Sequence, residues 1–66
     1  MIQAIEKAHA NGEDGVFIMK DDSMYYGRVW TVNNTFVGIM TRYGTVAEIY
    51  TTAIKSFARC DNRYTV

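Results

Sequence analysis

The sequence predicts a mainly β protein, in which a short N-terminal helix precedes a small, strongly bent antiparallel barrel of five strands. Three observations lead to this prediction. Apolar residues recur at helical spacing near the N-terminus, five short apolar or alternating segments follow, and turn-forming residues separate these segments. The chain has 66 residues, which is room for one domain, and we assign residues 1–66 to it.

The segment MIQAIEKAHANG predicts one amphipathic helix over about residues 2–10. Ile2, Ile5 and Ala8 recur at helical spacing, with polar positions between them. Asn11-Gly12 is expected to end the helix, because both residue types tolerate the left-handed backbone of a C-terminal cap. An isolated helix of this length is marginal, so we expect its apolar face to dock on the rest of the domain.

Residues from about 15 to 60 are expected to form the barrel. Asp, Asn, Ser, Thr and Gly separate its apolar segments, and these residues favour turns. The last residues, 61–66, show no strong pattern and are expected to form a frayed tail. The five predicted strands are GVFIMK (15–20), MYYGRVWTV (24–32), FVGIMTR (36–42), VAEIY (46–50) and IKSFARC (54–60).

Gly27 interrupts the run of large side chains in the long second strand. A long strand that serves two faces of a small barrel bends sharply, and glycine permits close backbone approach at such a bend. Gly27 shares one strand face with Tyr25 and Val29, while Tyr26 and Trp30 alternate to the other. We expect Tyr26 and Trp30 to pack under the helix or against a neighbouring subunit, because buried aromatics carry much interface energy.

The composition limits the classes of partner and cofactor. Seven basic and seven acidic residues cancel, so no net charge draws the chain to nucleic acid or to a membrane. One cysteine, Cys60, cannot form an internal disulfide, and one histidine, His9, does not suggest a zinc site, so we expect no cofactor. No apolar run approaches the ~18 residues of a membrane span, and no signal-peptide pattern opens the chain. We therefore expect a cytoplasmic protein with no membrane partner.

The sequence contains no pattern typical of an enzyme. It has no nucleophile paired with a base and no glycine-rich phosphate loop. The adjacent acids Glu13-Asp14 and Asp21-Asp22 lie in predicted turns, and nothing supplies the rest of a metal coordination shell. We expect a binding or structural protein.

The order of the segments FIMKDD, MYYGRV, TVNNTFVGIM and IYTTAIKSF resembles the Sm-like family, which includes bacterial Hfq and the LSm proteins. Asp21 stands where the acidic residue of the family's first motif belongs. Residues 49–54 match the second, shorter motif. The resemblance covers about residues 2–59 and lies in the collective spacing. The spaced apolar and glycine positions of the first motif are Tyr25, Gly27, Val29 and Val32, and Phe36 and Ile39 continue the third strand.

The resemblance implies an SH3-like barrel that assembles with copies of itself into a ring of about five to seven subunits. In such rings the fourth strand of one subunit pairs with the fifth strand of the next, which satisfies two open edges. The family binds uridine- or adenine-rich single-stranded RNA on the ring faces. Here the positions that hold uridine in the family carry Thr35, Val37 and Thr51. Asn33 replaces the aspartate that braces the pocket, and Asp22 replaces the glycine of the first turn.

Two groups of residues are candidates for RNA contact. Residues 33–35 with Thr51 and Thr52 would line the pore of a ring with amides and hydroxyls, although the same residues are ordinary in turns. Arg42 and Tyr43 pair a cation with an aromatic, a combination that stacks on bases, although residues at a hairpin tip are often only solvated. The full set of candidates is Asn33, Asn34, Thr35, Val37, Tyr50, Thr51, Thr52, Arg42 and Tyr43.

The sequence leaves two functions open. The first is an Sm-like ring that binds single-stranded RNA through a diverged uridine pocket. The second is a ring-shaped scaffold that binds a protein partner and no nucleic acid. The substituted pocket positions and the zero net charge favour the second, and the spacing of the two motifs favours the first.

Overall fold

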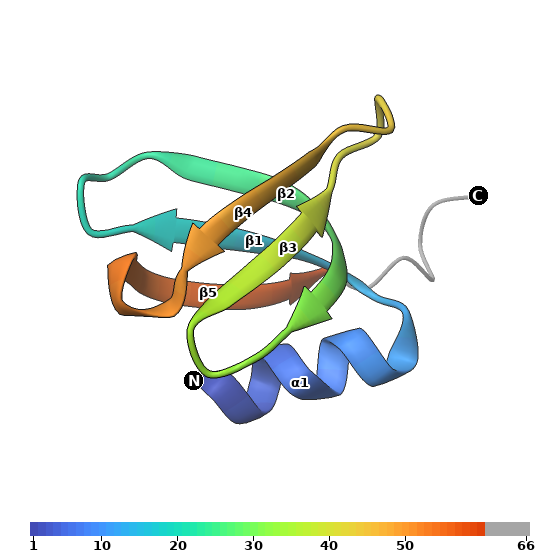
Figure 1. Cartoon of the computed structure of the whole chain (residues 1–66), viewed down its shortest axis with the longest axis horizontal. Helices are drawn as coiled ribbons and strands as arrows, with labels where there is room; N and C mark the ends of the chain where they lie inside the picture. The colour runs from blue at the N-terminus through green and yellow to red at the C-terminus, as the bar shows by residue number, and fades with distance from the viewer. Residues whose placement is uncertain (61–66) are drawn as a thin grey trace.

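The computed structural model describes residues 1–60, in which one helix precedes five antiparallel strands (Figure 1). The strands form one sheet in the order β4-β3-β2-β1-β5. The predicted fold class is therefore confirmed, and the expected tail at 61–66 lies outside the described residues. The elements are α1 (Ile2–Asn11), β1 (Asp14–Met19), β2 (Met24–Val32), β3 (Phe36–Met40), β4 (Val46–Tyr50), a 3-10 turn η1 (Thr51–Ala53) and β5 (Ile54–Cys60).

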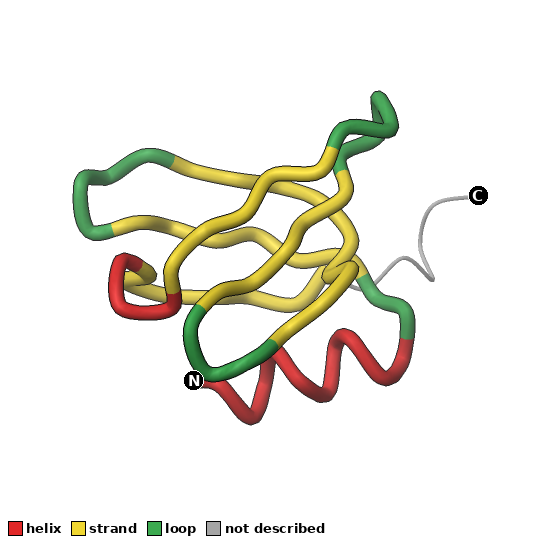
Figure 2. The backbone as a smooth tube through the Cα atoms, viewed as in Figure 1, coloured by secondary structure: helices red, strands yellow, loops and turns green. Residues whose placement is uncertain are grey.

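β2 turns the sheet back on itself. Its first half pairs with β1 up to Arg28, and its second half pairs with β3 from Arg28 onward. The register with β3 shifts between Val29 and Thr31, which leaves Trp30 as an extra residue. Such a β-bulge bends its strand and increases the local twist, and the backbone trace of β2 curves through this region (Figure 2).

Gly27 lies where β2 comes close to β3. A Cβ atom at this position would stand 2.5 Å from the Met40 carbonyl oxygen and 2.6 Å from Ile39 Cγ2. A glycine is therefore required by the approach of one backbone to another, as the sequence predicts.

The core fills the space between the bent sheet and α1, which packs against β2 and β5. α1 contributes Ile5 and Ala8, which are both almost completely buried. The helix ends at Gly12, which is in the left-handed region at φ 67° and donates its backbone N–H to the His9 carbonyl. The other buried apolar residues come from the strands: Phe17, Met19, Val29, Val37, Ile39, Ile49 and Ile54.

The expectation that Tyr26 and Trp30 pack beneath the helix is wrong. Tyr26 is 43% exposed and Trp30 is 55% exposed, because alternation along β2 directs both to the outer face of the sheet. The helix instead contacts Trp30 through the backbone, since His9 Nε2 donates to the Trp30 carbonyl oxygen over 3.1 Å. Whether either ring meets a neighbouring subunit stays a prediction.

The turn between β1 and β2 is held by its own side chains. Asp21 Oδ1 accepts hydrogen bonds from the Ser23 hydroxyl (2.6 Å) and the Ser23 backbone N–H (3.0 Å). These bonds, the hydroxyl first, lower the pKa of Asp21 below its ordinary value. Asp22, which follows, has φ 69° and makes an exposed ion pair with Lys55 at 3.4 Å.

We expect Asp22→Gly to raise the free energy of unfolding by about 0.5–1 kcal/mol. Glycine adopts a positive φ without the steric cost that a side chain carries there, and the exposed ion pair that is lost contributes little. Urea denaturation measures the change. Lys55→Gln is the matched control, because it removes the ion pair and leaves the backbone strain. Equal destabilisation by both variants would contradict the assignment of strain to Asp22.

Candidate nucleic-acid interface

Two turns that are far apart in the sequence meet at Thr51. Thr51 begins η1, and Asn34 and Thr35 belong to the turn between β2 and β3 (Figure 1). The Thr51 backbone N–H donates to the Thr35 carbonyl over 2.9 Å. Its hydroxyl donates to the carbonyls of Asn34 (2.9 Å) and Thr35 (3.2 Å). We call residues 33–35 and 51–52 the turn cluster.

Asn33 gives the first of these turns its shape. Its side-chain oxygen accepts hydrogen bonds from the backbone N–H groups of Thr35 (2.8 Å) and Phe36 (2.9 Å). An acceptor two and three residues before its donors is the usual geometry of an Asx turn. The amide oxygen of Asn33 is therefore occupied by the fold, in the place where the family resemblance puts a bracing aspartate.

The exposed part of the turn cluster is neutral and polar. The side chains of Asn34 and Thr52 are exposed and make no hydrogen bond to another residue of the 1–60 segment. Tyr50, which is 66% exposed, stands opposite Phe36 on the paired strands β4 and β3. An amide, a hydroxyl and an aromatic ring are groups that can hydrogen-bond and stack on a nucleobase.

Val37 is not part of this surface, and its assignment as an RNA-binding candidate is wrong. The residue is completely buried in the core. Along β3 the side chain of Val37 points inward beside Ile39, so no ligand can reach it without unfolding the sheet.

We expect Thr51→Val to lower the free energy of unfolding by about 1 kcal/mol. Valine keeps the shape of threonine but removes the hydroxyl that bridges to the Asn34 and Thr35 carbonyls. The same change is expected to speed hydrogen exchange of the backbone N–H groups in residues 33–35. Thr52→Val is the matched control, because the Thr52 hydroxyl has no partner within residues 1–60, and a change within about 0.5 kcal/mol is expected. Equal effects of the two variants would contradict the bridging role.

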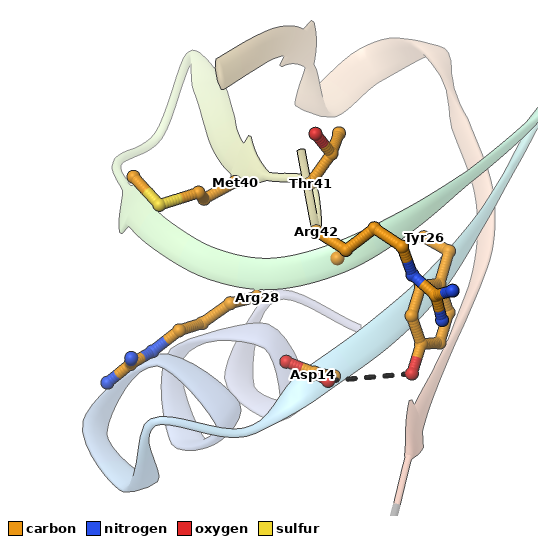
Figure 3. Close-up of a pocket in the computed structure, with 7 residues that line it drawn as sticks. Asp14, Tyr26, Arg28, Met40, Thr41 and Arg42 are labelled. Carbon is orange, nitrogen blue, oxygen red and sulfur yellow. Dashed lines mark hydrogen bonds between the residues drawn. The ribbon is translucent and has the colours of Figure 1, made fainter. Parts of the chain in front are cut away.

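Arg42 and Tyr43 lie at the opposite end of β3 and β4 from the turn cluster (Figure 1). Tyr43 is 85% exposed at the tip of the turn. Arg42 instead lines a pocket on the outer face of the sheet, together with Tyr26 (Figure 3). The structure thus gives Arg42 a different aromatic neighbour from the one that the sequence suggested.

The pocket beside Arg42 has a volume of about 230 Å³. The Tyr26 hydroxyl lies at its edge and donates a hydrogen bond to Asp14 Oδ2 over 3.4 Å (Figure 3). The negative charge of Asp14, followed by burial, raises the pKa of Tyr26 above its ordinary value, and the charge of Arg42 opposes this effect. Tyr26 is therefore neutral at physiological pH and can act as a hydrogen-bond donor.

Tyr26 and Arg28 were missed as candidate site residues. Alternation along β2 places both on the outer face with Trp30, which is a signal that the sequence contains. Tyr26 and Arg28 lie beside Arg42 because Arg28 on β2 pairs with Met40 on β3. A sequence pattern does not specify this strand register.

The described residues give no sign of a metal centre or a membrane span. Within residues 1–60, no three His, Cys, Asp or Glu side chains are grouped so that they could hold a metal ion. The one α-helix of this segment is too short and too polar to cross a bilayer.

The fold, by contrast, is found in other solved structures. No protein-family model matches the chain, and no curated protein matches it significantly. Among solved structures, the pleiotropic translational regulator Hfq is similar with a TM-score of 0.78 and 19% identity, over 88% of this chain and 86% of that one. An Hfq protein from Anabaena sp. is similar with a TM-score of 0.76 and 19% identity, over 89% and 93% of the two chains. The chain has the Sm-like fold.

The Sm-like fold agrees with the order of elements that the sequence predicts, from the N-terminal helix to the fifth strand. At 19% identity this likeness establishes architecture and leaves the ligand to the residues of this chain. Within residues 1–60, the turn cluster and the pocket beside Arg42 are two places where those residues form a candidate site.

Proposed function

We propose that the protein forms an Sm-like ring that binds single-stranded RNA through the turn cluster. The observation that carries this proposal is the bridge from Thr51 to the carbonyls of Asn34 and Thr35. It joins the turns of the two motifs and leaves the Asn34 amide and the Thr52 hydroxyl available to a nucleobase. These groups recognise base edges in single-stranded RNA.

Ring formation is supported by the edges of the sheet. β4 and β5 are the outer strands, and within the described chain each has a neighbour on one side only. Unpaired edges with few charges favour pairing with another chain, and a 66-residue domain gains stability from such pairing. We propose that β4 of one subunit pairs with β5 of the next, as the family resemblance implies.

The charge distribution predicts an unusual salt dependence for RNA binding at the turn cluster. Within residues 1–60, Lys55 is paired with Asp22 and Arg59 with Glu13, and no cation belongs to the turn cluster. RNA binding that depends on phosphate contacts weakens steeply with salt, because counterions are released. Binding by base edges alone is expected to change little with salt.

The first experiment measures mass and RNA binding together. Native mass spectrometry is expected to give a ring of identical subunits, and fluorescence anisotropy is expected to detect binding of U-rich, A-rich or mixed oligonucleotides at low salt. Asn34→Ala and Thr52→Ala are expected to weaken binding, whereas Gln3→Ala on the exposed side of α1 serves as the control. A ring that binds none of the three RNAs would overturn the RNA-binding part, and a monomer would overturn the assembly.

The alternative function is a ring-shaped scaffold for a protein partner. The observation that favours it is the exposure of large apolar side chains on a chain without net charge: Met24, Tyr26, Trp30, Tyr43, Val46 and Tyr50. Exposed apolar surface of this kind is typical of protein interfaces. Two results together would favour the scaffold. The ring would bind none of the RNAs, and a protein partner that the unchanged ring pulls down would be lost with a Trp30→Ala variant.

A further inference from the structure

The edge strand β4 has one charged side chain, Glu48, with a small pocket beside it. Phe36, Glu48, Ile49 and Tyr50 line this pocket, which has a volume of about 210 Å³. Tyr50 is paired with Phe36 on β3, and alternation puts Tyr50 and Glu48 on the same, outer face of β4. Within residues 1–60, Glu48 forms no ion pair and no hydrogen bond. Its carboxylate is therefore available to a cation from another chain.

The other edge strand, β5, carries the complementary charge. It contains Lys55 and Arg59 and no acid, whereas β4 contains Glu48 and no base. A contact that joins β4 of one copy to β5 of the next brings opposite charges together, whereas β4 joined to β4, or β5 to β5, brings like charges together. This complementarity favours β5 of a second copy as the strand that covers the β4 edge. The inference rests on the ring proposed above, and we call the line where β4 meets β5 of the next subunit the seam.

Lys55 is the cation that can change its partner most easily. Its ion pair with Asp22 is 3.4 Å long and joins side chains that are 60% and 82% exposed, so the pair contributes little to stability. Arg59 is held more firmly, because its guanidinium donates to Glu13 over 2.9 Å and both of these side chains are less exposed. The Lys55 side chain can therefore leave Asp22 and turn toward a neighbouring chain.

The lengths of the edge strands restrict how they can pair across the seam. β4 has five residues and β5 has seven, so an antiparallel pair that uses all of β4 allows only a few registers. In these registers the residue opposite Glu48 is Ser56, Phe57 or Ala58. Because side chains alternate between the two faces of a sheet, only the register with Phe57 puts Glu48 on the face that carries Lys55. Lys55 then stands directly opposite Tyr50 and diagonal to Glu48, which is within reach of a long side chain.

We propose that Lys55 of a second copy lies across the Tyr50 ring and pairs with the Glu48 carboxylate at the seam. The stem of a lysine packs on apolar surface while its charged end stays at a polar group, and the face of an aromatic ring attracts a cation. Lys55 thereby exchanges Asp22, an exposed partner in its own chain, for a partner at the seam. The pair selects a second copy in this register, because a partner strand without the cation leaves Glu48 unpaired.

The first test determines the register by disulfide cross-linking in a Cys60→Ser background. Chains with Tyr50→Cys are mixed with chains with Lys55→Cys, so that only a contact between two chains can join one variant to the other. Residues directly opposite each other on antiparallel strands lie within the Cα distance that a disulfide needs. We expect this mixture to form cross-linked dimers on oxidation, and a mixture of Tyr50→Cys with Ser56→Cys to form far fewer. Cross-linking that is no stronger with Lys55→Cys than with Ser56→Cys would overturn the register and keep the ring.

The second test reverses the charges. Glu48→Lys and Lys55→Glu are each expected to raise the protein concentration at half-assembly about tenfold or more, because like charges then meet at every seam. The double variant that carries both changes is expected to assemble nearly as well as the unchanged protein, since each seam again joins one acid to one cation. Glu6→Lys, on the exposed side of α1, is the matched control with the same charge change. Circular dichroism shows whether each variant chain still folds.

The outcomes separate this pair from the ring itself. Assembly that is equally strong in both single variants and in the unchanged protein would overturn the Glu48–Lys55 pair and leave the ring in place. Single variants that lose assembly without recovery in the double variant would also overturn the pair. A monomer of the unchanged protein, measured by native mass spectrometry, would overturn the proposed ring and the pair with it.

Discussion

Replacing Gly27 by alanine is expected to lower the free energy of unfolding by about 3 kcal/mol, at the upper end of the cost of overpacking. The new methyl group would stand 2.5 Å from the Met40 carbonyl oxygen and 3.1 Å from the Met40 carbonyl carbon. Met40 belongs to the ladder between β2 and β3, so its backbone cannot move without breaking pairs. Such a loss is a large part of the stability of a small domain. Urea denaturation followed by the fluorescence of Trp30 measures it.

Gly38→Ala is the matched control for this prediction. A Cβ at Gly38 would meet Thr31 Cγ2 at 2.7 Å, which is the end of a side chain and not backbone. We expect the loss from Gly38→Ala to be smaller, and to be partly recovered when Thr31→Ser removes that methyl group. An unchanged denaturation midpoint in Gly27→Ala would show that β2 and β3 are farther apart than the structure indicates.

The strand pattern could be predicted from the sequence because alternation and turn residues agree along most of the chain. The predicted limits of 24–32, 46–50 and 54–60 coincide with β2, β4 and β5. The third strand is shorter than predicted and ends at Met40. Thr41 belongs to the turn after β3 instead. Its hydroxyl oxygen hydrogen-bonds the Thr45 hydroxyl and also accepts a hydrogen bond from the Tyr43 backbone N–H. A local side-chain bond of this kind competes with the sheet ladder.

The candidate site could be predicted only in part. Residues 33–35 and Thr51 are brought together as the two motifs imply, through bonds that local sequence does not reveal. Val37 matches a family position that contacts RNA, but the alternation of side chains along β3 buries it in the core of this chain. The pairing of Tyr26 with Arg42 was missed because it depends on the bulge at Trp30 and on the register that follows it.

Replacing Phe17 by alanine is expected to lower the free energy of unfolding by about 3–5 kcal/mol, the usual cost of removing a buried phenyl ring. Phe17 is the largest completely buried side chain of the core. Its ring centroid lies 4.7 Å from that of Phe57 on β5, with the ring planes at 45°. Gly15 makes room for this contact, because a Cβ there would overlap the Phe57 ring. Loss of the Phe17 ring is expected to weaken the packing between β1 and the edge strand β5.

The Phe17 variant also distinguishes the stability of the single chain from that of a ring. If β5 pairs with a neighbouring subunit, unfolding is linked to assembly, and the denaturation midpoint rises with protein concentration. Phe57→Leu is the milder control, because Phe57 is only partly buried and leucine keeps most of its apolar volume. We expect Phe17→Ala to remain folded at high protein concentration and to unfold on dilution, and Phe57→Leu to stay folded at both. A midpoint independent of concentration in both variants would mean that the core of one chain alone sets the stability, which would contradict pairing of β5 with a second copy.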